Sequence, residues 1–165
     1  MGDEWVEVVD DEDRVLRQVT RAEMRRDNLL HRSVSVLCQN SAGAIYVHRR
    51  TDDKDVWPGL HDMFCGGVVS AGEGYAEAAR REAQEELGVH GVEPSFLFTH
   101  RYDGEHSRSQ IHAFTVVYDG PIVHQPAEVA WGRFCTLQEI VDNPEGWSFV
   151  PDGAELFGRY QALRR

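Results

Sequence analysis

The sequence predicts an α/β (α+β) domain in which helices pack against a mixed β-sheet. Two observations indicate this class: strand-like segments lie on both sides of a central amphipathic helix, and two further helical segments close the chain. With 165 residues, the chain can form one sizeable core but is short for two domains. Its 41% of hydrophobic and 27% of charged residues are ordinary for a globular protein. We therefore expect residues 1–165 to form a single domain.

The first 28 residues predict an N-terminal extension made of a β-hairpin and a short helix. Trp5–Val9 and residues 15–19 are strand-like, and the acidic cluster at 10–13 is turn-rich. We interpret this cluster as a solvated turn, because adjacent carboxylates repel each other unless a cation is present. Thr20 with Glu23 three residues later has the capping-box pattern that opens a helix.

The remaining elements follow from hydrophobic periodicity and turn residues. Strands are predicted at 33–39, 44–49, 94–102, 111–118 and 129–135, and helices at 74–87, 137–142 and 152–163. Residues 51–62 contain a Trp-Pro-Gly sequence and predict a loop. Asp152, in a Pro-Asp-Gly sequence, is expected to cap the last helix.

Charge and hydropathy exclude several classes of partner. The net charge of -11 argues against nucleic-acid polymers, although a divalent cation would still allow an acidic protein to bind a small phosphorylated molecule. The sequence has no apolar run near the ~18–20 residues that span a bilayer, and its N-terminus lacks a secretion signal. We expect a cytoplasmic protein. Its cysteines (Cys38, Cys65 and Cys135) lack zinc-ligand spacing and are expected to be reduced.

The segment from Gly67 to Val89 carries the most chemical information. Its glycines predict a tight loop before the helix, and Gly88 suits the helix C-cap. One stripe of this helix is predicted to be apolar and to contact the sheet: Ala76, Ala79, Ala83 and Leu87.

Carboxylates lie beside this apolar stripe. Glu82, Glu85 and Glu86 fall within roughly a third of the helix circumference. Because like charges at i,i+4 repel, the spacing of Glu82 and Glu86 suits a bound cation, and hard oxygen ligands suit Mg²⁺ or Mn²⁺. A solvated acidic helix face is the alternative. The glycine loop before the helix favours the metal site, since such a loop can present backbone carbonyls to the same cation.

The segment resembles the Nudix box, Gly-x5-Glu-x7-Arg-Glu-U-x-Glu-Glu-x-Gly-U, in which U is an apolar residue. The apolar positions are occupied by Ala83 and Val89, and the fixed positions are Gly67, Glu73, Arg81, Glu82, Glu85, Glu86 and Gly88. Every specified position over 23 residues therefore matches, so a chance match is improbable.

The resemblance implies a Nudix-type α/β/α sandwich with a loop–helix–loop metal site. Glu82, Glu85 and Glu86 would be metal-binding or catalytic carboxylates, and the carbonyl of Gly67 a further ligand. Arg81 would pair with Glu73 and hold the loop against the helix. In such enzymes Mg²⁺, or Mn²⁺, bridges the phosphates of the substrate and activates a water.

The general base is a separate question. It would be a carboxylate from the helix or one on a later loop, for which Glu128 is the candidate. A surface glutamate that merely precedes a strand is the alternative interpretation of Glu128.

The upstream segment resembles the isopentenyl-diphosphate isomerase branch of this superfamily and its hydrolase relatives. Residues 49–59 match its Arg-Arg-x3-Lys-x2-Trp-Pro-Gly stretch, and the N-terminal hairpin, short helix and Leu30-His31-Arg32 are also similar. Since the matching arginine and lysine contact the substrate diphosphate in the isomerases, the resemblance implies substrate-binding roles for Arg50, Lys54 and Arg49. Solvated cations at a strand end are the alternative.

Isomerase activity itself is the second hypothesis, and the sequence departs from its pattern. The isomerases have Cys-Gly-His-Pro, with a catalytic cysteine and a ligand histidine, whereas this chain has Cys65-Gly66-Gly67-Val68. The hydrolase box is intact, so we favour a hydrolase in which Cys65 is not a nucleophile and His31 is structural. A nucleotide-binding sensor without turnover is a third hypothesis, disfavoured because all the catalytic carboxylates are present.

The substrate is expected to be a small diphosphate, first of all a nucleoside di- or triphosphate. Several aromatic side chains could stack on a base, namely Trp57, His61, Tyr102 and Trp131. Nucleotide sugars and isoprenoid diphosphates stay open as alternatives. A homodimer formed through the N-terminal hairpin is also open.

Overall fold

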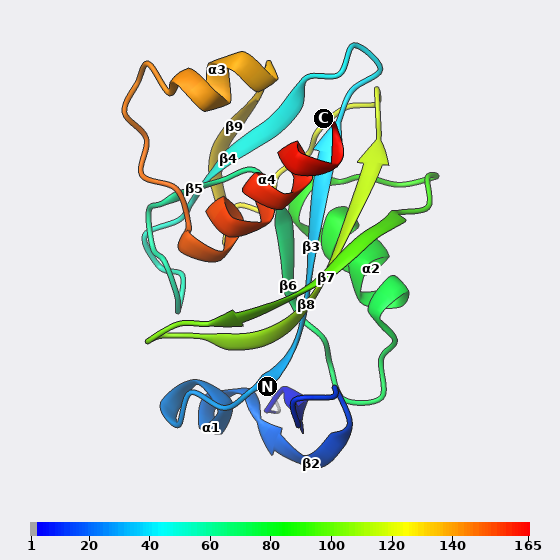
Figure 1. Cartoon of the computed structure of the whole chain (residues 1–165), viewed down its shortest axis with the longest axis vertical. Coiled ribbons are helices and arrows are strands. Elements are labelled where there is room, and N and C mark those ends of the chain that lie inside the picture. Colours follow the sequence, from blue (N-terminus) through cyan, green and yellow to red (C-terminus); the bar gives the residue numbers. More distant parts are fainter. Residues whose placement is uncertain (1–2) are drawn as a thin grey trace.

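The computed structural model describes residues 3–165 (Figure 1). Its elements, in chain order, are β1 (Trp5–Val9), β2 (Val15–Thr20), α1 (Arg21–Arg26), β3 (His31–Gln39), β4 (Ile45–Arg50), β5 (His61–Asp62), β6 (Cys65–Val68), α2 (Tyr75–Leu87), β7 (Ser95–Asp103), β8 (Arg108–Val117), β9 (Val129–Cys135), α3 (Leu137–Asp142) and α4 (Pro151–Leu163).

The β-sheet is mixed, and β3 lies at its centre. β3 pairs in parallel with β8 along its whole length, from His31 beside Ser109 to Gln39 beside Val117. It also pairs antiparallel with β1, β4 and β6. β7 continues the sheet beyond β8, while β5 and β9 both pair with β4. The predicted N-terminal hairpin of β1 and β2 is present, and its pairing with β3 makes it part of the same sheet.

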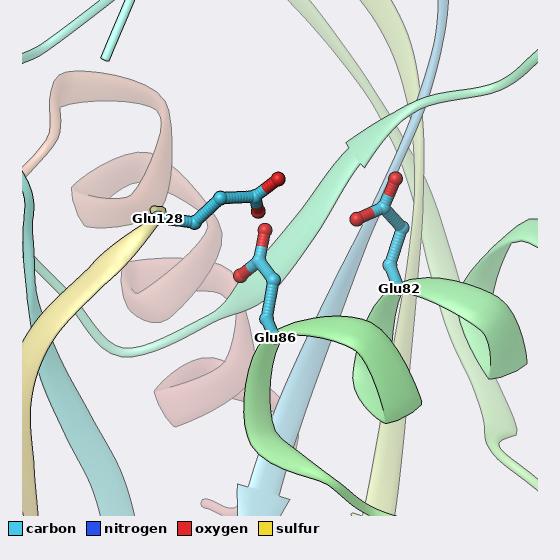
Figure 2. Close-up of side chains that lie close together, drawn as sticks. All are labelled: Glu82, Glu86 and Glu128. Carbon is cyan, nitrogen blue, oxygen red and sulfur yellow. The ribbon is translucent and has the colours of Figure 1, made fainter. Parts of the chain in front are cut away.

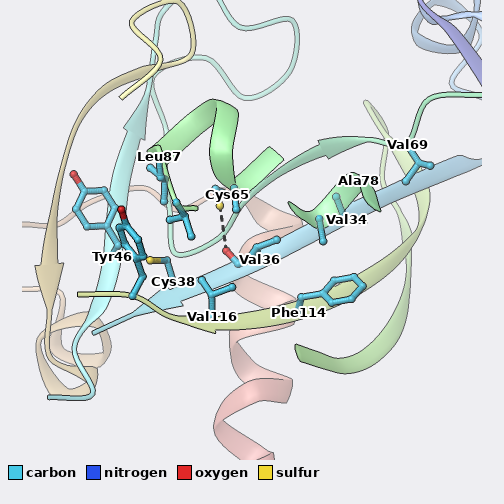
Figure 3. Close-up of a cluster of buried hydrophobic side chains, with 14 residues drawn as sticks. Val34, Val36, Cys38, Tyr46, Cys65, Val69, Ala78, Leu87, Phe114 and Val116 are labelled. Carbon is cyan, nitrogen blue, oxygen red and sulfur yellow. Dashed lines mark hydrogen bonds between the residues drawn. The ribbon is translucent and has the colours of Figure 1, made fainter. Parts of the chain in front are cut away.

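Successive side chains of β3 point to opposite faces of the sheet, so the core has one part on each face. Val34, Val36 and Cys38 belong to one buried cluster, together with residues of α2 such as Ala78 and Leu87 (Figure 3). Leu37 belongs to a second cluster that includes Leu156 and Phe157 of α4. Helices therefore cover both faces of the sheet, which confirms the expected mixed α/β fold with a sandwich of layers.

The strand β6 was not predicted, because a Gly-Gly pair has low strand propensity. Its glycines are needed here for close approach and not for a left-handed backbone. A Cβ on Gly66 would lie 2.0 Å from the backbone oxygen of Val34 on the neighbouring strand. Gly72, in the loop between β6 and α2, does have a positive φ of 81° and lies in the tight turn that the sequence predicts.

Two details of the helices differ from the predictions. Asp152 is not the cap of α4: the helix begins at Pro151 with Val150 as N-cap, because the fixed φ of proline suits the first helical position. Ala76 is exposed on α2, and Ala78 occupies the buried stripe in its place. None of the helices between residues 3 and 165 is long and apolar enough to cross a membrane.

Candidate active site

Three carboxylates converge beside β6: those of Glu82 and Glu86 on α2 and that of Glu128 just before β9 (Figure 2). Each contributes an oxygen, and these oxygens all lie within 4.8 Å of one another. Glu82 and Glu86 are neighbours because they are one helical turn apart. The third carboxylate comes from a different part of the chain and completes the group.

The position of Glu128 follows from contacts between the preceding loop and the C-terminal end of α2. The backbone N–H of Val123 donates to Leu87 O at 2.9 Å, and that of Gln125 donates to Glu86 O at 3.1 Å. These bonds also satisfy carbonyls that the end of the helix would otherwise leave free. The loop is therefore fixed to the same helical turn that carries Glu86, and Glu128 lies opposite it.

Burial makes this group of carboxylates electrostatically unfavourable without a cation. Glu86 is 3% exposed, and burial, reinforced by Glu82, raises its pKa well above the usual range. Burial also raises the pKa of Glu82 to about 7, although Arg81 opposes the change. A divalent cation would relieve this repulsion, and carboxylate oxygens are the hard ligands that Mg²⁺ and Mn²⁺ prefer. The donor set fits such an ion.

Arg81 connects the loop to the helix and to the carboxylate group. Its Nε and Nη2 donate to the two oxygens of Glu73 at 2.7 and 2.8 Å, and its Nη1 donates to Glu82 Oε1 at 2.8 Å. Glu73 in turn accepts from the backbone N–H of Ser70 at 3.1 Å. The arginine therefore fixes both the loop and the orientation of Glu82.

The glycines of β6 lie directly against the carboxylates. A Cβ on Gly67 would lie 2.6 Å from Glu82 Oε1, so any larger residue would displace that carboxylate. The backbone N–H of Gly66 donates to Glu86 Oε2 at 3.4 Å. Glu85, by contrast, is exposed and lies outside the group of three, with its Oε2 3.3 Å from Arg81 Nη1.

A small cavity of about 80 Å³ adjoins the carboxylates through Lys54, Gly66 and Gly67. Lys54 Nζ lies 3.7 Å from Glu128 Oε2. Four cations from α1, β4 and the loop at 51–60 line this cavity, namely Arg21, Arg25, Arg50 and Lys54, together with the acids Asp55, Asp62 and Asp152. The cationic side chains of this lining, beside the carboxylates, can bind phosphate oxygens.

A larger cavity of about 620 Å³ continues from the small one and lies between α1, the loop at 51–60 and the tip of the β7–β8 hairpin. The two cavities share Arg25, Asp55, Val56 and Trp57. The far wall of the larger cavity includes Asn28, Pro58, Leu60, Glu105 and His106.

Not every residue expected at the substrate reaches these cavities. Arg50, Lys54 and Trp57 line them. Arg49 lines neither and is paired with Asp52 at 2.9 Å. Tyr102 also lines neither cavity. It is buried in the hydrophobic cluster beneath α4, because side chains alternate between the two faces of β7 and that of Tyr102 lies on the inner face. Its position gives it a packing role.

Cys65 and His31, at the positions of isomerase residues, are both deeply buried. The thiol of Cys65 donates to Val36 O at 3.5 Å, and burial raises its pKa well above the usual value. His31 Nδ1 lies 2.9 Å from Leu29 O, and burial lowers the pKa of the ring to about 4. A neutral thiol and a neutral imidazole held by backbone carbonyls are structural features of this site.

Several cavity residues were not predicted. Arg21, Arg25 and His106 come from α1 and from the tip of the β7–β8 hairpin, and only the sheet topology brings them to the cavity. One signal in the sequence was available, because Arg21 and Arg25 are one helical turn apart. In the structure both pair with Asp55, at 3.2 and 3.0 Å.

Comparison with known proteins gives a consistent result. The family model described as the NUDIX domain matches residues 29–153. An uncharacterized Nudix hydrolase of Streptomyces coelicolor is 43% identical over 165 residues, covering 99% of this chain and 91% of the relative. An uncharacterized Nudix hydrolase of Rhodococcus erythropolis is 39% identical, covering 96% of this chain and 92% of the relative.

Solved structures agree in fold. A crystal structure of a Deinococcus radiodurans protein superposes with a TM-score of 0.77 at 27% identity, covering 94% of this chain and 98% of the other. The MutT protein of Methanosarcina mazei superposes with a TM-score of 0.70 at 20% identity, covering 82% of this chain and 96% of the other. At that identity the second likeness shows the fold alone.

Proposed function

Because the chain belongs to the Nudix hydrolase family, we propose that it is a Mg²⁺- or Mn²⁺-dependent enzyme that hydrolyses a phosphoanhydride bond. The proposed substrates are nucleoside di- and triphosphates or related nucleoside-diphosphate derivatives. The observation that carries the proposal is the group formed by Glu82, Glu86 and Glu128 beside a cavity lined by cations. One part of the site needs a divalent cation, and the adjacent part suits phosphate oxygens.

Glu82 and Glu86 are proposed to hold the cation, together with the backbone carbonyl of Gly67. Glu85 would join them only after its carboxylate leaves Arg81. When bound, such a cation would supply Lewis-acid chemistry to the phosphate groups and lower the pKa of a nearby water. Arg81 and Glu73 would keep Glu82 in place during this step.

Glu128 is proposed as the general base. Its side chain is 35% exposed, the most accessible of the three, so it can accept a proton from water and pass it to solvent. Lys54, next to Glu128, and Arg50, on the cavity wall, would bind the substrate phosphates. Both can compensate the charge that develops on the departing phosphate.

The test is product identification with a panel of candidate substrates in Mg²⁺ or Mn²⁺. The panel contains nucleoside di- and triphosphates, nucleotide sugars, dinucleoside polyphosphates and isopentenyl diphosphate. We expect hydrolysis products from a nucleoside compound and loss of turnover in excess chelator. Binding without turnover would replace the proposal by a nucleotide sensor. Conversion of isopentenyl diphosphate to its isomer would replace it by isomerase chemistry.

A further inference from the structure

We propose that the larger cavity binds the nucleoside of the substrate and that Trp57 and His106 select its base. The inference rests on the proposed function, because it takes the diphosphate to lie in the small cavity beside the carboxylates. It adds the place of the organic group and the residues that determine specificity.

The carboxylate group, the small cavity and the larger cavity adjoin one another in that order. Lys54 contacts Glu128 at one end and lines the small cavity. The small cavity then meets the larger one at Arg25, Asp55 and Trp57, which line both. A phosphorylated compound that extends from the small cavity into the larger one has its phosphates at Lys54 and Arg25. Its organic group then lies beyond them, at Trp57.

The sizes of the two cavities indicate which part of the substrate each one holds. About 80 Å³ is too small for a nucleoside, whereas about 620 Å³ lies within the ~300–1,000 Å³ typical of small-molecule sites. The phosphate groups therefore occupy the smaller space, and the organic group requires the larger one.

The walls of the larger cavity suit a nucleobase. The rings of Trp57 and His106 have their centroids 5.8 Å apart and are inclined at 73°, so the two rings pack edge to face. Aromatic faces stack on bases, while Asn28 Oδ1 and the Glu105 carboxylate in the same wall provide acceptor atoms for a base edge. An isoprenoid chain would make no use of these polar groups.

The backbone holds both aromatic residues in place. Trp57 has a φ of 53°, which non-glycine residues rarely adopt, and Arg50 donates to Trp57 O at 3.2 Å and to Val56 O at 2.9 Å. Asn28 Nδ2 donates to Gly104 O and Glu105 O at 3.0 and 3.1 Å, which fixes the hairpin tip that carries His106. Arg50 therefore couples the phosphate cavity to the position of the Trp57 indole.

The experiment compares Trp57→Ala and His106→Ala with the wild-type full-length protein. The kinetic substrates are adenosine, guanosine, cytidine and uridine diphosphates, and methyl diphosphate serves as a compound with the phosphates but no nucleoside. We expect KM for the preferred nucleoside diphosphate to rise by about tenfold or more in each variant, because stacking on a base contributes strongly to its binding. KM for methyl diphosphate should change less than about twofold. Trp57→Phe should restore most of the affinity.

Matched controls use the same substitution elsewhere. Trp5 is 51% exposed on the N-terminal hairpin and lines neither cavity, so Trp5→Ala should match the wild type. Trp131, in the separate aromatic group with His61 and Trp147, tests the other stacking position. A larger KM effect from Trp131→Ala than from Trp57→Ala would overturn the inference. His106→Ala keeps the test valid if Trp57→Ala fails to fold, since His106 is exposed at a hairpin tip.

Binding measured by calorimetry separates this inference from the hydrolase proposal. The probes are the non-hydrolysable α,β-methylene analogues of the four nucleoside diphosphates, in Mg²⁺. If the wild type binds an analogue and both variants lose that affinity, the nucleoside site stands even without turnover. If the wild type binds none of the analogues, or if both variants keep wild-type affinity, the nucleoside site is wrong even if other diphosphates are hydrolysed.

Discussion

Arg81 and Glu73 form a doubly hydrogen-bonded ion pair, with N···O distances of 2.7 and 2.8 Å, that joins the glycine loop to α2. The remaining terminal nitrogen of Arg81 reaches Glu82 at 2.8 Å. The same guanidinium therefore sets the loop and one of the three converging carboxylates. A lysine at this position carries its three N–H donors on one nitrogen and cannot reproduce the two parallel bonds to Glu73 while also reaching Glu82.

We accordingly expect Arg81→Lys to lower kcat by about 10- to 100-fold, the usual cost of losing a group that orients a metal ligand. The melting temperature should fall as well. Steady-state kinetics at saturating Mg²⁺ and thermal unfolding would measure the two effects. The control is Arg80→Lys, because the neighbouring Arg80 makes an exposed pair with Glu93 at 2.9 Å and should tolerate the change. Equal kcat values for the two variants would contradict the orienting role.

Glu86 is the most buried of the three carboxylates and lies between the other two in Figure 2. Glu86→Gln keeps the shape of the side chain but removes the charge that a cation needs, so we expect turnover to fall by at least about 10²-fold. Circular dichroism should show an intact fold. Glu77→Gln, an exposed change on the same helix, should leave the rate unaltered. Near-normal turnover of Glu86→Gln would remove the central mechanistic claim.

The thiol of Cys65 is packed in the core beneath α2 and stays protonated, since its pKa is raised well above the usual value. A protonated thiol is a poor nucleophile. We therefore expect Cys65→Ala to keep kcat within a few-fold of the wild type. Cys38→Ala is the matched control, because Cys38 lies in the same cluster and only packing changes there. A loss of several orders of magnitude confined to Cys65→Ala would revive isomerase-like chemistry.

Local patterns predicted most of the elements, because they depend on neighbouring residues. Thr20 caps α1 by accepting from the backbone N–H of Glu23, and Gly88 ends α2 in a left-handed conformation, both as expected from sequence. β6 was missed because the reason for Gly66 lies on another strand, at the backbone of Val34. The Asp152 cap was wrong because Pro151 itself begins the helix.

The residues of the candidate site likewise include some that local sequence patterns predict and some that depend on tertiary contacts. Glu82 and Glu86 could be predicted to be neighbours from helical spacing alone, and the Nudix box supplied Arg81 and Glu73. The proximity of Glu128 depends on the loop bonded to the end of α2, and that of Arg25 on the pairing of β1 with β3. Such contacts join segments distant in sequence, so no short motif encodes them.

Asp62 provides a pH-dependent prediction that is independent of the carboxylate group on α2. It is 8% exposed, accepts from the backbone N–H of Phe64 at 3.0 Å and lies against Gly153 at the start of α4. Burial, reinforced by Asp152 and opposed by Arg50, raises its pKa to about 7. An unfolded aspartate has a pKa of about 3.9. Between these values the folded protein retains a proton that the unfolded chain has lost.

The direction in which the free energy of unfolding changes with pH follows from proton linkage. The stabilising contribution of Asp62 is fully present below about pH 4, declines by up to about 1.4 kcal/mol per pH unit and is lost as the pH rises through about 7. Asp62→Asn cannot ionise, so its free energy of unfolding relative to the wild type should increase between pH 5 and 7.5. Urea unfolding of both proteins in excess chelator measures this difference, in which the titration of the carboxylates on α2 cancels. Gln84→Asn, an exposed change between two residues that do not ionise, should give a difference that is constant with pH. A constant difference for Asp62→Asn as well would show that Asp62 is already ionised in the folded protein at pH 5.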